Sequence, residues 1–146
     1  KFKNNFKFSL GKALSPLNSQ NTVWFKKIFS LMYLPVTCSM RATDIWRGII
    51  ALNIILNDNL SVLFFGTTMK QIRNVHNLFD DLEQEMPLYN DVFNAFKILR
   101  SLNLKKGSKY YLKNLVKSYE ALIKQKIFDK KELIYLNAWV RDIKNL

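Results

Sequence analysis

The chain has 146 residues, of which 49% are hydrophobic and 14% aromatic, so we expect one packed domain or part of one rather than a disordered segment. Its net charge of +12 favours polyanionic partners such as nucleic acid, lipid headgroups or phosphorylated small molecules. The single cysteine, Cys38, excludes an intrachain disulfide and a cysteine-based zinc cluster, and no apolar run is long enough to cross a bilayer. The chain opens on Lys1 rather than Met, which predicts a piece of a longer protein.

Residues 1–20 are expected to be irregular or extended, and a helical spacing of apolar side chains then predicts a helix over about 22–32. A loop leads into a helix over about 44–56, whose broad apolar stripe indicates burial on two sides. Residues 57–59 end that helix, and residues 60–65 are predicted to form a short buried strand. This alternation favours an α/β arrangement over a pure helical bundle.

The rest of the chain is expected to be helical after a polar loop over 67–77. One helix is predicted over about 76–85, stopping at Pro87, and another over about 91–102. Two apolar faces, from Leu112 to Ile123 and from Leu133 to Ile143, predict a C-terminal helical hairpin. Asp129 and Glu132 match a capping box at the start of its second helix.

The segment Leu34–Ile50 carries the most informative residues, because Arg41, Thr43 and Asp44 stand where an extended apolar stretch turns into a helix. Charged groups at such a junction are costly to bury unless they are paired or used. One interpretation is a helix capped by Thr43 or Asp44, with Asp44 paired to Arg41. The other places the Asp44 carboxylate at the floor of a ligand cleft. Residue types alone favour the first, since capping acids are common.

His76 is the only histidine, and it lies in the polar loop just past the predicted strand, where α/β sheets usually bind ligands. Asp80 and Asp81 follow about one helical turn later, so a metal site and an ordinary polar loop residue are both open interpretations.

Lysines recur every four residues at Lys105, Lys109, Lys113 and Lys117. This spacing predicts a solvated helix face, with a phosphate-binding or membrane-binding strip as the rival interpretation. Little aromatic interleaving accompanies these lysines, so nucleic-acid binding is not expected.

Four motifs occur in a fixed order: Ser15–Thr22 (SPLNSQNT), Leu34–Gly48 (LPVTCSMRATDIWRG), Gln71–Asn77 (QIRNVHN) and Ala138–Ile143 (AWVRDI). Together they resemble the C-terminal part of the STELLO family of glycosyltransferases, over nearly the whole chain after Gly11. The first two motifs and the spacing between them are the specific ones.

The resemblance implies a predominantly helical α/β fragment, the C-terminal part of a GT-A-like glycosyltransferase domain with one or two short strands and a C-terminal helical hairpin. Residues 1–77 would end the catalytic region and residues 78–146 would form a C-terminal helical region of the same domain. The nucleotide-binding half, with its metal-binding acids, would lie outside this chain, so the fragment alone is not expected to turn over. The family further implies the Golgi lumen, as part of a type II membrane protein, with membrane contact only through a preceding N-terminal segment.

The resemblance also implies roles for individual residues. In GT-A-like enzymes an acid followed by a Trp-containing helix often marks the acceptor side, so Asp44, followed by Ile45 and Trp46, would act as the base or acceptor anchor. His76 would face the donor diphosphate with a divalent metal, Mn²⁺ or Mg²⁺, bound to the nucleotide sugar. The residues expected to line the substrate site are Ser15, Asn18, Asn21, Thr22, Arg41, Thr43, Trp46, Arg47, Arg73 and Asn74.

Two functional hypotheses remain open at this level. The first is transfer of a sugar from a nucleotide-sugar donor to a glycan or other acceptor in Golgi polysaccharide or cell-wall synthesis. The alternative is a non-catalytic luminal scaffold or interaction module that assists a polysaccharide synthase complex, with Asp44 and Arg41 as a structural pair. Candidate macromolecular partners are a synthase complex, with which the plant family is associated, or a homo-oligomer.

Overall fold

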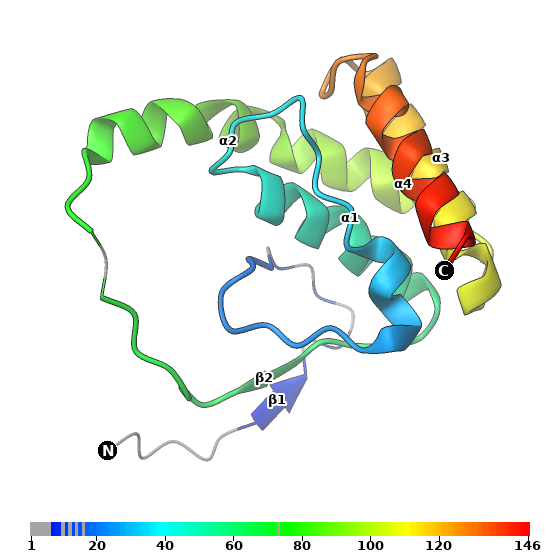
Figure 1. Cartoon of the computed structure of the whole chain (residues 1–146), viewed down its shortest axis with the longest axis horizontal. Coiled ribbons are helices and arrows are strands. Elements are labelled where there is room, and N and C mark those ends of the chain that lie inside the picture. Colours follow the sequence, from blue (N-terminus) through cyan, green and yellow to red (C-terminus); the bar gives the residue numbers. More distant parts are fainter. Residues whose placement is uncertain (1–6, 10, 12, 14, 16, 73) are drawn as a thin grey trace.

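A computed structural model describes residues 7–9, 11, 13, 15, 17–72 and 74–146 of the chain. Helices dominate this part of the chain, with one small two-stranded sheet at its edge (Figure 1). The prediction of a predominantly helical α/β fragment with a C-terminal hairpin is confirmed. In chain order the elements are β1 (Lys7–Ser9), the 3₁₀ helix η1 (Lys26–Leu31), α1 (Thr43–Asn57), β2 (Leu63–Phe65), α2 (Leu78–Ser101), the 3₁₀ helix η2 (Ser108–Tyr110), α3 (Tyr111–Lys124) and α4 (Glu132–Lys144).

Helix α1 forms the centre of the core, because it contacts α2, α3 and η1. Most of its side chains between Trp46 and Ile55 are buried, which confirms the predicted burial on two sides. Each large aliphatic side chain buried in this way contributes about 1.5–3 kcal/mol of hydrophobic stabilisation. Helices α3 and α4 pack side by side as the predicted hairpin and close the core with Tyr119 and Leu136 (Figure 1).

Helix α2 is continuous from Leu78 to Ser101, so the predicted break at Pro87 is wrong. Proline removes one backbone hydrogen bond from the helix and usually bends or ends it. Pro87 is tolerated here because it lies on an exposed face, while Leu88, Ala95 and Leu99 bury the following turns against the core. The Asn77 side chain caps the helix start by accepting a hydrogen bond from the amide of Phe79 at 3.0 Å.

The helix predicted over 22–32 is wrong in length and type, because the structure contains only the 3₁₀ turn η1 at Lys26–Leu31. The backbone reverses at Asn21, which has a φ of 50°, and Phe25 is still extended. Val23 is 80% exposed and Phe25 74% exposed, so the apolar spacing does not define one buried face.

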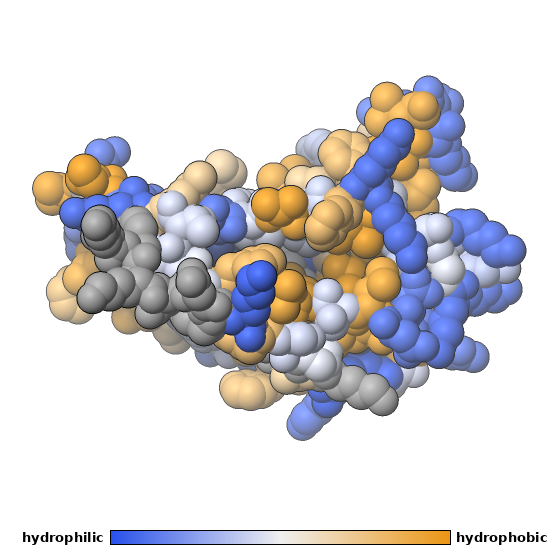
Figure 2. All heavy atoms as spheres, turned by 90° about the horizontal axis from the view of Figure 1, so that it is seen from below, coloured by the Kyte–Doolittle hydropathy of each residue, from blue (hydrophilic) through white to orange (hydrophobic). Residues whose placement is uncertain are grey.

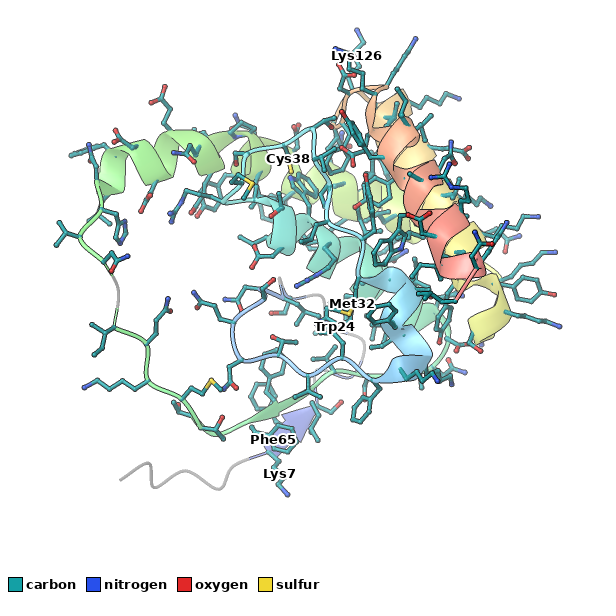
Figure 3. The ribbon with its side chains drawn as sticks, viewed as in Figure 1. Lys7, Trp24, Met32, Cys38, Phe65 and Lys126 are labelled. Atoms are coloured by element: carbon teal, nitrogen blue, oxygen red, sulfur yellow. The ribbon has the colours of Figure 1, made fainter. Side chains whose placement is uncertain are left out.

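The predicted buried strand over 60–65 is also corrected, since β2 covers only Leu63–Phe65 and its Leu63 and Phe65 are 49% and 56% exposed. It pairs in antiparallel register with β1, from Lys7 opposite Phe65 to Ser9 opposite Leu63. The Lys7 ammonium lies 5.7 Å from the centre of the Phe65 ring, and both residues project from the same edge of the molecule (Figure 3). Within the described residues, β1 and β2 pair only with each other, so the sheet has just two strands and most of its side chains remain exposed.

The surface is uneven in polarity. On the face shown in Figure 2, hydrophilic side chains are densest at the end of the molecule that carries α3 and α4, whereas apolar side chains reach the surface over the middle of the face and near both ends. The predicted lysine face, Lys105, Lys109, Lys113 and Lys117, is exposed. Among the helices of the described residues, none combines the length and apolar character needed to cross a membrane.

Asp58 ties the end of α1 to the loop before α3. Its carboxylate accepts hydrogen bonds from the Gly107 amide and the Tyr111 hydroxyl, each at 2.6 Å. These two bonds, that of Tyr111 foremost, lower the pKa of Asp58 below its usual value, because they favour the ionised carboxylate.

We expect Asp58→Asn to lower the melting temperature at neutral pH and to differ less from wild type under acid conditions. Because the pKa of Asp58 is lower in the folded than in the unfolded chain, its stabilisation is present above the unfolded pKa of about 3.9 and lost as pH falls through the folded pKa. Thermal melts across a pH series measure this, with the exposed carboxylate variant Asp142→Asn as control. A melting difference that stays constant down to strong acid would contradict the assignment.

Candidate functional site

An open cleft of about 420 Å³ lies at the start of α1. It is built by the N-terminal segment around residue 19, the loop before α1, the first turn of α1 and one acidic side chain of α2. Most of its wall is polar. The lining residues are Asn18, Ser19, Gln20, Leu34, Met40, Arg41, Thr43, Asp44, Ile45 and Glu85.

Asp44 lies in this cleft and is only partly buried. Its Oδ2 accepts a hydrogen bond of 2.7 Å from the backbone amide of Ser19. The predicted capping role is wrong, because α1 follows Ala42 with no side-chain cap and the Thr43 hydroxyl donates to the Met40 carbonyl. Asp44 is nevertheless in the first helical turn, where the helix dipole favours a negative charge.

Arg41 does not pair with Asp44, which corrects the second half of the structural interpretation. Its guanidinium binds two carboxylates of α2, that of Asp81 at 2.8 Å and that of Glu85 at 3.0 Å. Glu85 also accepts a 2.8 Å hydrogen bond from the Tyr89 hydroxyl. The positive charge of Arg41 is therefore already balanced by two acids of α2, and Asp44 lines the cleft without an ion pair to Arg41. Neither α2 acid was predicted here, because both lie about forty residues further along the chain.

Arg47 is a buried residue of α1 that holds the cleft residue Ser19 in place. It is only 4% exposed, donates a 3.1 Å hydrogen bond from Nη2 to the Ser19 hydroxyl, and places its guanidinium carbon 4.9 Å from the centre of the Trp24 ring. Burial lowers the pKa of Arg47, and the nearby Asp44 carboxylate partly opposes this. Arg47 therefore fixes Ser19, whose amide in turn holds Asp44.

Gly48 lets the N-terminal segment approach α1 closely. A Cβ atom at this position would lie 2.3 Å from the backbone oxygen of Leu17 and 2.8 Å from its nitrogen, which is closer than side-chain atoms can pack. Leu17 is itself buried, so the segment that carries Asn18 and Ser19 lies directly on the helix. An isolated glycine inside a helix is the sequence signal for such close packing.

We expect Gly48→Ala to destabilise the chain by about 1–3 kcal/mol, because the Leu17 backbone must move and the added methyl is overpacked. Helix propensity alone would make the alanine variant about 1 kcal/mol more stable. The sign of the change in unfolding free energy therefore shows whether close packing or helix propensity dominates. Urea unfolding measures the stability, and hydrogen exchange at the Ser19 amide reports the lost bond to Asp44. A variant more stable than wild type, with unchanged exchange at Ser19, would contradict this packing.

The loop before α1 is held by a buried carboxylate of α4. Glu132 is fully buried and accepts hydrogen bonds from the Tyr33 hydroxyl, the Val36 amide at 3.1 Å, and the Thr37 amide and hydroxyl at 2.8 and 2.6 Å. The predicted capping box is therefore wrong, because α4 follows Lys131 with no side-chain cap. Asp129 accepts a bond from the Lys131 amide at 2.7 Å, but the Glu132 side chain turns inward to the loop.

Trp46 lines a second, smaller cavity of about 220 Å³ instead of the cleft, and its ring packs edge-on against Phe128. Cys38 lines the same cavity. Burial, together with the nearby Glu132 charge, raises the pKa of the Cys38 thiol to about 12. A thiol with so high a pKa stays protonated at neutral pH, which agrees with a structural role.

The other expected site residues that the structure describes lie outside the cleft. Asn21 donates a 2.9 Å hydrogen bond to the Thr68 hydroxyl, and the Thr22 hydroxyl donates to the Asn18 carbonyl at 3.0 Å. Both bonds shape the N-terminal segment. Asn74 is exposed in the loop before α2, and Arg73 lies outside the described residues. Ser15 is partly buried and does not line the cleft.

His76 contacts the Asp81 carboxylate through Nδ1, and Asp81 also binds Arg41. The predicted neighbourhood of His76 and Asp81 is thus present. Among the described residues, no group of three His, Cys, Asp or Glu side chains is arranged to hold a metal ion. The described residues therefore do not form a complete metal site.

Comparisons with known proteins place the chain in a family. Neither the curated proteins nor the solved structures contain a match. The family model described as STELLO glycosyltransferases matches residues 41–146, which include α1 with Asp44 and the C-terminal hairpin. Because this match covers well over half of the sequence, the chain belongs to the STELLO glycosyltransferase family.

Proposed function

We propose that this chain is the C-terminal part of a GT-A-like glycosyltransferase domain and supplies the acceptor side of its active site. The reaction would transfer a sugar from a nucleotide-sugar donor to a glycan or other acceptor. Residues 1–77 would complete the catalytic region, and residues 78–146 would form the helical region that supports it. Membership of the STELLO glycosyltransferase family supports the transferase class.

The Asp44 cleft is the observation that carries the proposal. One carboxylate oxygen, Oδ2, is fixed by the Ser19 amide at 2.7 Å. The other, Oδ1, makes no hydrogen bond to a residue that the structure describes, while Asp44 lines the cleft. A carboxylate that is fixed by one oxygen and open at the other can orient an acceptor hydroxyl and take its proton. This supports Asp44 as the base or acceptor anchor.

The surroundings favour an uncharged hydroxyl group in the cleft. Arg41 is already balanced by Asp81 and Glu85, so it offers little attraction to an acidic acceptor. Asn18 and Gln20 line the same cleft, and their amides can both donate and accept hydrogen bonds. Such a lining suits the hydroxyl groups of a sugar, and it gives Arg41 a positioning role.

On the donor side, we assign His76 and Arg73 to face the diphosphate of the nucleotide sugar, with Asn74 beside them. The family suggests a divalent metal, Mn²⁺ or Mg²⁺, but the described residues of this chain do not complete a set of ligands for it. None of the steps proposed for this chain passes through the metal. A Golgi luminal location, in polysaccharide or cell-wall synthesis, is likewise part of the proposal.

Calorimetric titration of UDP with Mn²⁺ tests the donor side, using a STELLO-family protein that carries this chain as its C-terminal part. We expect binding that weakens about tenfold in His76→Ala, as for loss of a group near a metal, and that is retained in Asp44→Asn. Lys70→Ala is the matched control, because Lys70 is an exposed residue of the same loop. A folded wild-type protein that binds no UDP would contradict the UDP-sugar proposal and favour the non-catalytic scaffold.

A further inference from the structure

One carboxylate of α2 joins the donor and acceptor sides of the candidate site. Oδ1 of Asp81 lies 2.8 Å from Nη1 of Arg41, and Oδ2 of the same carboxylate contacts Nδ1 of His76. Arg41 lines the Asp44 cleft, whereas His76 lies at the end of the loop that leads from β2 to α2 (Figure 1). The Asp81 side chain is only 15% exposed. Both of its oxygens are therefore used, one on each side of the site.

Asp81 is itself held in place at the start of α2. Its amide donates a 3.1 Å hydrogen bond to the Asn77 carbonyl, and the Asn77 side chain caps the same turn. Further along the helix, Leu88, Ala95 and Leu99 are buried against the core. The dipole of the helix also favours a negative charge in its first turn. The carboxylate is therefore a fixed point to which its two partners are bound.

The contact with Asp81 determines which nitrogen His76 offers to a ligand. An ionised carboxylate only accepts hydrogen bonds, so Nδ1 of His76 is the donor and carries the proton. In the neutral ring Nε2 is then the unprotonated nitrogen, and it makes no hydrogen bond to a residue that the structure describes. A carboxylate that holds one ring nitrogen in this way fixes the orientation of the whole ring. His76 therefore presents Nε2 in one defined direction.

The same carboxylate fixes the guanidinium of Arg41. Asp81 binds its Nη1, and Glu85 binds its Nε at 3.0 Å, so two of the three guanidinium nitrogens are held by α2. The two acids are four residues apart, which places them on one face of the helix. A planar guanidinium bound at two points can move only by breaking a charged hydrogen bond. Asp81 thereby helps to set the position of the cleft wall at Arg41.

We propose that Asp81 is a positioning residue shared by the donor and acceptor sides of the site. It orients His76 for the donor and holds Arg41 along the acceptor cleft, so the loss of this one carboxylate disturbs both sides. The inference rests on the proposed transferase function, which assigns His76 to the donor and the Asp44 cleft to the acceptor. Asp81 acts only through its two partners, whereas an ion pair that merely stabilised the start of α2 would leave substrate binding unchanged.

The tautomer of His76 tests the first contact without any substrate. His76 is the only histidine, so proton–nitrogen NMR spectra of the 146-residue chain report its ring alone, with circular dichroism to verify folding. Under alkaline conditions, where imidazole is neutral, we expect the proton on Nδ1 in the wild type and a shift toward Nε2 in Asp81→Asn. Asp80→Asn is the matched control, because it removes the same charge from an exposed position of the same helical turn. A wild-type ring protonated on Nε2, or a tautomer unchanged in Asp81→Asn, would overturn the inference.

Donor binding and acceptor kinetics test the shared role in a STELLO-family protein that carries this chain. Asp81→Asn is expected to weaken the binding of UDP with Mn²⁺ about tenfold, as for loss of a group that orients a binding residue. It should also raise the KM of the glycan acceptor that the wild type uses best, again about tenfold. His76→Ala should change donor binding alone, and Arg41→Gln the acceptor KM alone. Asp80→Asn should change neither.

The outcomes separate this inference from the proposed function. Thermal melts verify that each variant is folded, and Asp81→Ser takes the place of Asp81→Asn if the latter does not fold. If the wild type binds UDP while the Asp81 variant changes only one side, or only lowers the melting temperature, the shared role is wrong and the proposed function stands. If the wild type binds no UDP, the proposed function fails and the shared role fails with it, even where His76 keeps its contact with Asp81.

Discussion

Asp44→Asn is expected to lower sugar transfer by about 10²–10⁴-fold in a STELLO-family protein that carries this chain, the range for loss of a positioned base. Asparagine has nearly the same shape as aspartate, and its side-chain oxygen can still accept the hydrogen bond that the Ser19 amide donates to Asp44. The cleft should keep its geometry while the group at position 44 loses the ability to take a proton. The readout is initial transfer rate against a panel of UDP-sugars and glycan acceptors.

Glu85→Gln is the matched control for this prediction. Glu85 is a second carboxylate of the same cleft, but its two oxygens are engaged by Arg41 Nε and the Tyr89 hydroxyl. Its loss should weaken the positioning of Arg41 and reduce the rate far less than Asp44→Asn. If Asp44→Asn transfers sugar at the wild-type rate, the catalytic assignment is wrong. If Asp44→Asn instead unfolds the protein with UDP binding absent in the wild type, the scaffold alternative is favoured.

Local patterns predicted the helices that bury a continuous apolar face. The side chains of α1, α3 and α4 repeat at helical spacing over three turns or more, so the period alone located these helices to within a few residues. The polar triplet at Asn57 to Asn59 likewise predicted the end of α1, where Asn59 adopts a φ of 58°. These features depend on neighbouring residues along the chain and are therefore readable from sequence.

Contacts between distant segments decided what local patterns could not. Pro87 is a helix breaker by its own chemistry, but core packing of Leu88 and the turns after it keeps α2 continuous. The partner of Asp44 is the amide of Ser19 and not, as the local pattern predicted, Arg41. Arg41 is held instead by α2 acids. A sequence pattern can therefore identify a charged residue, but its hydrogen-bond or ion-pair partner is determined by the fold.

The buried role of Glu132 was not predicted either, because its partners lie in a distant segment of the chain. At the start of α4 a glutamate three residues after Asp129 satisfies the capping-box pattern, which is normally solvent-exposed. In the fold the side chain is buried and serves the loop at Tyr33 to Thr37, about one hundred residues earlier. That loop continues to Met40 and Arg41, which line the cleft. The C-terminal hairpin thereby positions one wall of the candidate acceptor site.

Glu132→Ala is therefore expected to destabilise the fold by about 3–5 kcal/mol, because it leaves several buried hydrogen-bond donors without an acceptor. The Tyr33 hydroxyl and the amides of Val36 and Thr37 would lose their common partner. At roughly 3 °C per kcal/mol for a domain of this size, the melting temperature should fall by about 10–15 °C. Thermal melts of Glu132→Ala are compared with Glu120→Ala, which removes an exposed glutamate from α3.

A double-mutant cycle with Thr37→Val separates this hydrogen-bond network from general damage to α4. The Thr37 hydroxyl donates to Glu132 at 2.6 Å, so the two substitutions share one interaction and their effects should be less than additive. Additive losses, or a Glu132→Ala melting temperature equal to that of Glu120→Ala, would contradict the network. Glu132→Gln is a milder variant that should loosen the loop without unfolding the chain. Acceptor-dependent transfer should then fall, because the cleft wall at Arg41 depends on this loop. UDP binding should persist, because the donor side does not depend on it.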